Sequence, residues 1–148
     1  MIFLGSDHAG FELKEAVKKH LEQRGEEFKD LGTFSTEPVD YTIVAAKVGN
    51  AVTNCEDAKG LLFCGTGVGI SIAANKVNGI RAACCSDYFS AKLTRLHNNA
   101  NILCLGGRVV GIGVAFELVD VFLNTDFCGD DRHQKRIDQI TMIENGQL

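Results

Sequence analysis

Short apolar runs alternate along the chain with longer segments in which apolar residues recur every three or four positions. The short runs are typical of buried β-strands and lie at residues 2–5, 27–31, 60–63, 80–85 and 102–105. The wider spacing is typical of helices and follows each run, at residues 11–24, 40–54, 67–76, 86–96 and 112–122. Ser86 is a favourable N-cap residue for the fourth of these helices. The pattern therefore predicts five strands, each followed by a helix.

Strands this short, with little polar alternation, are typical of a parallel sheet that is covered on both faces. We therefore expect an α/β fold, a Rossmann-like three-layer αβα sandwich around a five-stranded parallel sheet. A further amphipathic segment begins near Arg132 and carries Ile137, Ile140 and Ile143 at helical spacing. This extra C-terminal helix exceeds what five strand–helix units need, so we expect it to pack on a neighbouring subunit.

Composition places the chain among single-domain globular proteins. It has 148 residues, of which 45% are hydrophobic and 23% charged, so we expect one domain over residues 1–148. The 15 basic against 19 acidic side chains give a net charge of −4, which does not favour binding to nucleic acid. No apolar run approaches the ~20 residues that a bilayer requires, and the N-terminus lacks a basic leader region. We therefore expect a cytoplasmic protein with no membrane segment.

Polar and glycine residues follow three of the predicted strands, in the segments 6–10, 64–71 and 106–108. In a parallel sheet, ligands bind where such segments meet, at the carboxyl ends of the strands. The alternative to a ligand site is that these segments are ordinary turns, in which Asp7 serves only as a helix cap. Known nucleotide motifs do not fit, because Phe11 and Glu12 stand where a P-loop needs Lys and Ser/Thr, and 65–69 is one residue short of the dinucleotide fingerprint. The glycine-rich segment therefore predicts backbone amides that hold a small anion.

Cys64 is the most informative of the six cysteines. It ends a predicted strand and precedes a helix N-terminus, where the helix dipole favours a thiolate that can act as a nucleophile or a general base. The hydroxyl of Thr66 lies two residues further on. The alternative for Cys64 is a small buried hydrophobic residue, and we expect that role for the other five cysteines, which are Cys55, Cys84, Cys85, Cys104 and Cys128.

His97 and Asn98 form a candidate acid–base and amide pair in the polar segment 96–101. They precede the fifth strand, whereas Cys64 ends the third, and opposite ends of a strand are roughly 17–20 Å apart. Either the chain loops back, or His97 serves a site on a second subunit. We favour a site that is shared across a dimer. His20 is expected to be an ordinary histidine of the first helix.

Arg132 and Arg136 stand four residues apart, so both guanidinium groups leave the same face of a helix. Two guanidinium groups in that arrangement can bind one phosphate or carboxylate, and Arg108 could bind the same anion. The alternative is that Arg132 and Arg136 only form a basic turn in contact with solvent. The four histidines show no H-x-x-x-H spacing, so the sequence predicts no metal site.

Together these residues resemble the type B ribose-5-phosphate isomerases, a family that includes galactose-6-phosphate and allose-6-phosphate isomerases. The matching motifs run in order over nearly the whole chain and are Ser6-Asp-His-Ala-Gly-Phe11, Cys64-Gly-Thr-Gly-Val-Gly-Ile-Ser-Ile-Ala-Ala-Asn-Lys76, His97-Asn98 with Asn101, Gly107-Arg108-Val-Val, and Arg132-His-Gln-Lys-Arg136. The chain departs from the family pattern at Thr42, where the family has proline, and at Asp130-Asp131, where it has a glycine pair.

The resemblance implies a reversible, cofactor-free conversion of ribose 5-phosphate to ribulose 5-phosphate through an enediolate. In that scheme Cys64 takes the proton from C2, Thr66 relays protons between the two oxygens, and His97 opens the furanose ring. Asp7 and Asn98 hold substrate hydroxyls. The remaining implied substrate contacts are His8, Arg108, Arg132 and Arg136 on the phosphate, the backbone at Gly65, Gly67, Val68 and Gly69 on the enediolate, and Tyr41 in the neighbouring loop.

Two other functions compete with this interpretation. A six-carbon phosphosugar isomerase, acting on allose 6-phosphate or galactose 6-phosphate, would use the same residues. A non-catalytic phosphate-binding regulator would need the glycines and arginines but neither the thiol nor the imidazole. The family pattern also implies a homodimer, with pairing into tetramers left open.

Overall fold

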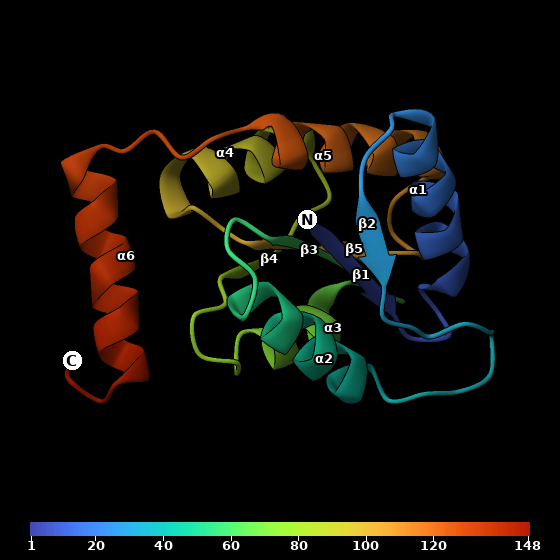
Figure 1. Cartoon of the computed structure of the whole chain (residues 1–148), viewed down its shortest axis with the longest axis horizontal. Helices are drawn as coiled ribbons and strands as arrows, with labels where there is room; N and C mark the ends of the chain where they lie inside the picture. The colour runs from blue at the N-terminus through green and yellow to red at the C-terminus, as the bar shows by residue number, and fades with distance from the viewer.

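The computed structural model describes residues 1–148 and confirms the predicted αβα architecture (Figure 1). Its one parallel sheet comprises β1 (Ile2–Ser6), β2 (Phe28–Asp30), β3 (Lys59–Cys64), β4 (Ala82–Cys84) and β5 (Ile102–Gly106). The helices are α1 (Phe11–Gln23), α2 (Tyr41–Thr53), α3 (Val68–Ala74), α4 (Tyr88–Asn98), α5 (Ile112–Asn124) and α6 (Asp131–Glu144). None of them is long and apolar enough to cross a membrane.

Two local predictions around β4 were wrong. The N-cap of α4 is Asp87 rather than Ser86, because the Asp87 carboxylate accepts a hydrogen bond of 2.8 Å from the Ser90 amide. β4 begins two residues later than predicted, because the Arg81 amide donates to the side chain of Asn101 instead of to a neighbouring strand. In both cases a local side-chain acceptor takes up the backbone amide.

The strand order is β2-β1-β3-β5-β4, and it defines where a ligand can enter the sheet. The connection from β1 through α1 leads outward to β2, whereas the connection from β3 through α3 leads to the opposite edge, at β4. The strand order therefore reverses between β1 and β3. In open parallel sheets the crevice outside the carboxyl ends at such a point is the usual ligand site.

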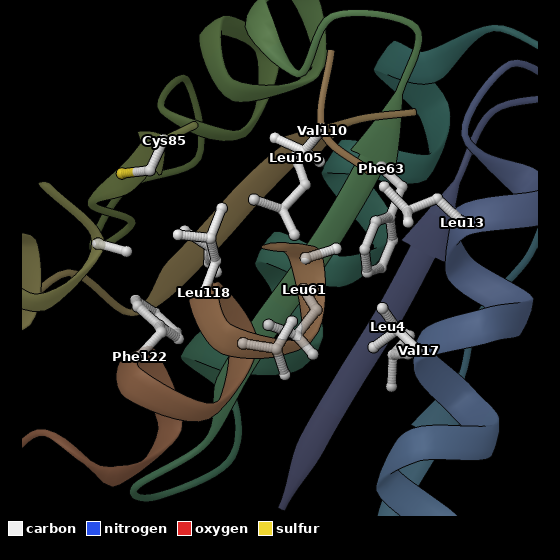
Figure 2. Packing of buried hydrophobic residues seen from close by; sticks show 14 of the residues in the cluster. Leu4, Leu13, Val17, Leu61, Phe63, Cys85, Leu105, Val110, Leu118 and Phe122 are labelled. Atoms are coloured by element: carbon white, nitrogen blue, oxygen red, sulfur yellow. The ribbon is translucent and has the colours of Figure 1, made fainter. Parts of the chain in front are cut away.

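Helices cover both faces of the sheet (Figure 1). α1, α4 and α5 lie on one face, and α2 and α3 lie on the other. The larger core cluster fills the first face, where Leu61, Phe63 and Leu105 of the strands pack against Leu13 and Phe122 of the helices (Figure 2). This packing fixes the strand ends, and so it fixes the turns that follow them.

A buried ion pair anchors the turn beside β1. Lys14 of α1 is fully buried, and its ammonium group donates to the carboxylate of Asp30 and to the carbonyl oxygen of Thr33, the latter at 2.7 Å. The Thr33 amide in turn donates to the carbonyl oxygen of Ser6 at 2.8 Å. The Lys14 side chain thereby ties the end of β2 to the end of β1, one residue before Asp7.

Helix α6 stands away from the sheet and packs mainly on α4 (Figure 1). A groove of 530 Å³ runs between α6 and the body of the molecule, with Ile140 and Ile143 of α6 on one side and Arg81 and Asn98 on the other. Ile143 is 60% exposed. An amphipathic helix normally buries its apolar stripe, whereas α6 leaves part of its stripe exposed.

Gly10 permits the closest approach between α1 and the sheet. A Cβ at this position would lie 2.3 Å from the carbonyl carbon of Phe63 and 2.6 Å from the Cys64 nitrogen. We expect Gly10→Ala to lower the free energy of unfolding by about 2 kcal/mol, since the backbone of a central strand must move. Gly113→Ala is the matched control, because a Cβ there meets nothing within 4 Å and should stabilise α5 by about 0.5–1 kcal/mol. Urea unfolding measures both, and equal stability of the two variants would contradict the prediction.

Candidate active site

The turns after β1, β3 and β5 are tied together by backbone hydrogen bonds. The Asp7 amide donates to the carbonyl oxygen of Phe63 at 3.1 Å, and the Gly107 amide donates to that of Cys64 at 2.8 Å. The Arg108 amide reaches the carbonyl oxygen of Gly65 at 3.0 Å. The polar residues of these turns therefore meet at one edge, on both sides of the point where the strand order reverses, as the sequence predicted.

Cys64 lies at the centre of this edge. It is 4% exposed, and its sulfur accepts a hydrogen bond of 3.1 Å from the Gly67 amide. Gly67 has φ +80°, and a Cβ there would lie 2.9 Å from the sulfur of Cys84, so a side chain does not fit at this position. The amide donor stabilises negative charge on the Cys64 sulfur.

The glycine-rich turn offers fewer free amides than its sequence implied. The Gly67 amide is used by the Cys64 sulfur, and the Val68 amide donates to the Thr66 hydroxyl at 3.3 Å. The amides of Gly65, Thr66 and Gly69 donate no hydrogen bond within the chain. The Ile70 amide likewise donates none, so these four amides are the donors that remain for an oxyanion.

Asp7 orders the turn before α1 but does not cap the helix, because the N-cap residue is Gly10 and no side chain caps it. Its Oδ1 atom accepts hydrogen bonds of 2.9 Å from the amides of Ala9 and Gly10, which fixes the carboxylate at the start of α1. Oδ2 has no hydrogen-bond partner within the chain and remains available to a ligand hydroxyl. His8 accepts from the Val39 amide through Nδ1 at 3.2 Å, so in the neutral ring the proton is on Nε2, which can donate to an anion.

Tyr41 and Arg108 flank the glycine-rich turn. A Cβ on Gly69 would lie 2.8 Å from the Tyr41 ring, and one on Gly65 would lie 3.3 Å from a terminal nitrogen of Arg108. Both side chains are therefore in contact distance of the turn, and both are exposed. A ligand anion seated on the turn would meet the guanidinium group of Arg108 directly.

His97 belongs to a second cluster, on α4 and α6. Its ring stacks on that of His133, with ring centroids 4.2 Å apart. Burial lowers the pKa of His133, and the neighbouring His97, Arg132 and Arg136 lower it further. The side chains of Arg132 and Arg136 are exposed beside this pair, which leaves both guanidinium groups accessible.

Within one chain the two clusters do not come together. The Arg81 side chain, just before β4, donates to the carbonyl oxygens of Asn98 at 3.0 Å and Asn99 at 2.9 Å. The end of α4 therefore lies at the amino edge of the sheet, whereas Cys64 lies at the carboxyl edge. The chain does not loop back to join them. A site that uses both Cys64 and His97 needs two chains.

The structure corrects the prediction for three cysteines. Cys85 and Cys104 are buried as expected, but Cys84 and Cys128 are exposed and Cys55 is half-buried. Cys84 ends β4, Cys55 follows the end of α2, and Cys128 lies in the loop between α5 and α6, so none of the three is inside an element of the core. Although the residue is exposed, partial desolvation raises the pKa of the Cys84 thiol above its ordinary 9.0, and the neighbouring Cys64 raises it further.

Sequence reasoning passed over two residues near the candidate site. Cys84 is the last residue of β4, as Cys64 is of β3, but the predicted strand continued to Cys85 and so placed Cys84 inside it. His133 stands between Arg132 and Arg136, but no periodicity in the sequence places its ring on that of His97.

Comparisons with known proteins give a consistent result. The chain is 50% identical to ribose-5-phosphate isomerase B of Escherichia coli over 97% of its own length and 95% of that protein. Ribose-5-phosphate isomerase B of Clostridium thermocellum has the same fold, with a TM-score of 0.94, 47% identity and 99% of each chain covered. The Mycoplasma genitalium enzyme with bound ribulose-5-phosphate matches with a TM-score of 0.91 and 41% identity, over 97% of this chain and 95% of that one.

The profile of the ribose/galactose isomerase family matches residues 2–140, which include every candidate site residue named above. The matched span contains the thiol at the end of β3, the glycine-rich turn and the arginine pair of α6. We conclude that this chain belongs to the ribose/galactose isomerase family.

Proposed function

We propose that this protein interconverts ribose 5-phosphate and ribulose 5-phosphate without a cofactor, with Cys64 as the general base. The observation that carries the proposal is the Cys64 thiol, held by the Gly67 amide at the edge where the strand order reverses. The relatives named ribose-5-phosphate isomerase B, and the related enzyme with bound ribulose-5-phosphate, support this choice of substrate.

The isomerisation moves one proton between two carbons of the open-chain sugar. The Cys64 thiolate takes the proton from C2, and the electron pair of that C–H bond forms the enediolate. The amides of Gly65, Thr66 and Gly69, which donate no hydrogen bond within the chain, are the donors that stabilise the charge of the developing oxyanion. The Thr66 hydroxyl relays a proton between O1 and O2, and Cys64 then returns its proton to C1 to give the ketose.

The closed furanose must open before this step, which moves a proton from the anomeric hydroxyl to the ring oxygen. His97 is the acid–base group for that transfer, and Oδ2 of Asp7 and the amide of Asn98 hold hydroxyl groups. The phosphate is held by the side chains of His8, Arg108, Arg132 and Arg136. A phosphate gripped in this way fixes the sugar relative to the sulfur.

The site is complete only when two chains combine. One chain contributes Cys64 and the glycine-rich turn, and its partner contributes His97 and the arginines of α6. Two features support this arrangement: the separation of the clusters within one chain, and the groove beside α6 with its exposed apolar residues. A symmetric dimer would then hold two equivalent sites. Pairing of dimers into tetramers is compatible with the same sites.

A direct assay tests the reaction. Purified protein should convert ribose 5-phosphate to ribulose 5-phosphate with the same kcat, measured at saturating substrate, with and without EDTA. Allose 6-phosphate and galactose 6-phosphate are the comparison substrates, since members of the family act on sugars of either length. A clear preference for a six-carbon sugar would show that the proposed substrate is wrong, while the proposed proton-transfer mechanism would still apply. Absence of turnover on all three, with retained phosphate binding, would favour a binding module.

Subunit exchange tests the shared site. Cys64→Ala and His97→Ala homodimers should each be inactive, and mixing them in equal amounts should restore about a quarter of the wild-type rate. About half of the dimers are then mixed, and each mixed dimer holds one site without either substitution. Verified exchange that restores no activity would mean that one chain builds the whole site, and a mixture of two Cys64→Ala preparations is the negative control.

A further inference from the structure

Three different metal-ligating side chains converge at the start of α6. One ligand atom from each of Cys128, Asp130 and His133 lies within 4.8 Å of the other two. Cys128 and Asp130 are on either side of a turn at Gly129, and the Asp130 amide donates to the Cys128 sulfur at 3.5 Å. None of the three side chains has a role in the proposed reaction, although His133 stacks on His97 and Asp130 lies beside Arg132.

Two of these side chains have unused bonding capacity. Asp130 is the N-cap residue of α6, where a carboxylate normally accepts a hydrogen bond from the first turn, yet this side chain makes no capping bond. His133 is only 7% exposed, and its Nε2 atom is buried without any hydrogen-bond partner. A buried polar nitrogen in that state is unfavourable unless a ligand satisfies the ring.

We propose that Cys128, Asp130 and His133 form a zinc-binding site. Thiolate sulfur, imidazole nitrogen and carboxylate oxygen are the ligands that Zn²⁺ accepts, and water would complete a tetrahedron. Zinc–ligand bonds of about 2.0–2.3 Å require the three atoms to move closer together. Cys128 and Asp130 are exposed and free to do so. Binding replaces the S–H bond of Cys128 with a Zn–S bond and releases one proton to solvent.

Zinc would also change the charge beside the arginines of α6. Without metal the cluster has one negative charge, on Asp130, whose carboxylate lies 3.9 Å from Arg132. With zinc the two positive charges of the ion are balanced by the thiolate and the carboxylate, so the cluster becomes neutral. Arg132 then has no competing carboxylate. This consequence rests on the proposed phosphate role of Arg132, whereas the metal site itself does not.

Metal titration of the full-length protein under reducing conditions tests the site. Calorimetry with Zn²⁺ should give one ion per chain, and Co²⁺ should give the near-ultraviolet charge-transfer band of a thiolate ligand. Cys128→Ser should abolish the band, and Asp130→Asn should weaken zinc binding. Cys84→Ser is the matched control, because it removes another exposed thiol and should leave both signals unchanged.

Two outcomes would overturn the metal site. One is that Cys128→Ser binds zinc with the wild-type stoichiometry and keeps the Co²⁺ charge-transfer band. The other is that Cys84→Ser loses both zinc binding and the band. The charge effect has its own measurement. Zinc should lower KM for ribose 5-phosphate in the wild type but not in Cys128→Ser. An unchanged KM with zinc bound would contradict the charge effect alone and leave the metal site intact.

Discussion

Cys64→Ala is expected to lower kcat for ribose 5-phosphate by at least ~10², with KM little changed. The substitution removes the group that takes the C2 proton, while the phosphate contacts and the free amides of the glycine-rich turn stay in place. Steady-state kinetics of the variant and the wild type measure the effect.

Cys84→Ala is the control for that substitution. The Cys84 sulfur lies beside Gly67 in the same crevice, so the two variants lose the same atom a short distance apart. Its raised pKa keeps the thiol protonated, which makes it unfit as a base. We expect kcat within about twofold of wild type. Equal losses of kcat in the two variants would show that packing beside the turn, and not proton transfer, explains the effect.

Asp30→Asn is expected to lower the free energy of unfolding by about 3–5 kcal/mol. The Asp30 carboxylate accepts hydrogen bonds from Lys14, and from Lys18 at 2.8 Å. Without that charge the buried Lys14 ammonium group keeps only Glu15, at 3.4 Å, as an acidic neighbour. Denaturant unfolding measures the loss. Asp120→Asn is the control, because its more exposed ion pairs with His20 and Arg24 should contribute less than about 1 kcal/mol.

The same ion pair predicts a pH dependence. Burial by itself raises the pKa of Asp30, but the hydrogen bonds from Lys14 and Lys18 outweigh it and lower the pKa below the ordinary 3.8. A carboxylate whose pKa is lower in the folded state stabilises the protein above the unfolded pKa and loses that effect as the pH falls through the folded value. The stability gap between wild type and Asp30→Asn should therefore narrow below pH 3.8. Denaturant unfolding at each pH measures this difference in stability. A difference that stays constant down to pH 2.5 would exclude the ion pair as its cause.

Much of the carboxyl edge could be predicted because, in a parallel sheet, the residues that directly follow each strand all lie at the same edge. Once 60–63 is read as a buried strand, Cys64 must lie at the edge with Asp7 and Arg108. The same logic predicted the separation of His97 from Cys64, since a helix that follows a strand returns antiparallel to it.

Contacts that depend on side-chain orientation could not be predicted. Nothing in the spacing of His97 and His133 implies that their rings stack, because the two residues lie on separate helices, α4 and α6, with β5 and α5 between them in the chain. Asp87 rather than Ser86 caps α4 because the carboxylate reaches the Ser90 amide, a choice between two good capping residues that propensity does not decide. The number of free amides in the glycine-rich turn likewise depends on Gly67 adopting φ +80°.

The placement of α6 has a consequence for local stability. A helix that rests mainly on one neighbour and exposes apolar residues can open without unfolding the sheet, so its amide hydrogens should exchange with solvent faster than those of β3. If a second chain covers α6, exchange there becomes sensitive to dilution, while exchange in β3 does not. The arginines of α6 would then be the part of the site whose order depends most on how much protein the solution contains.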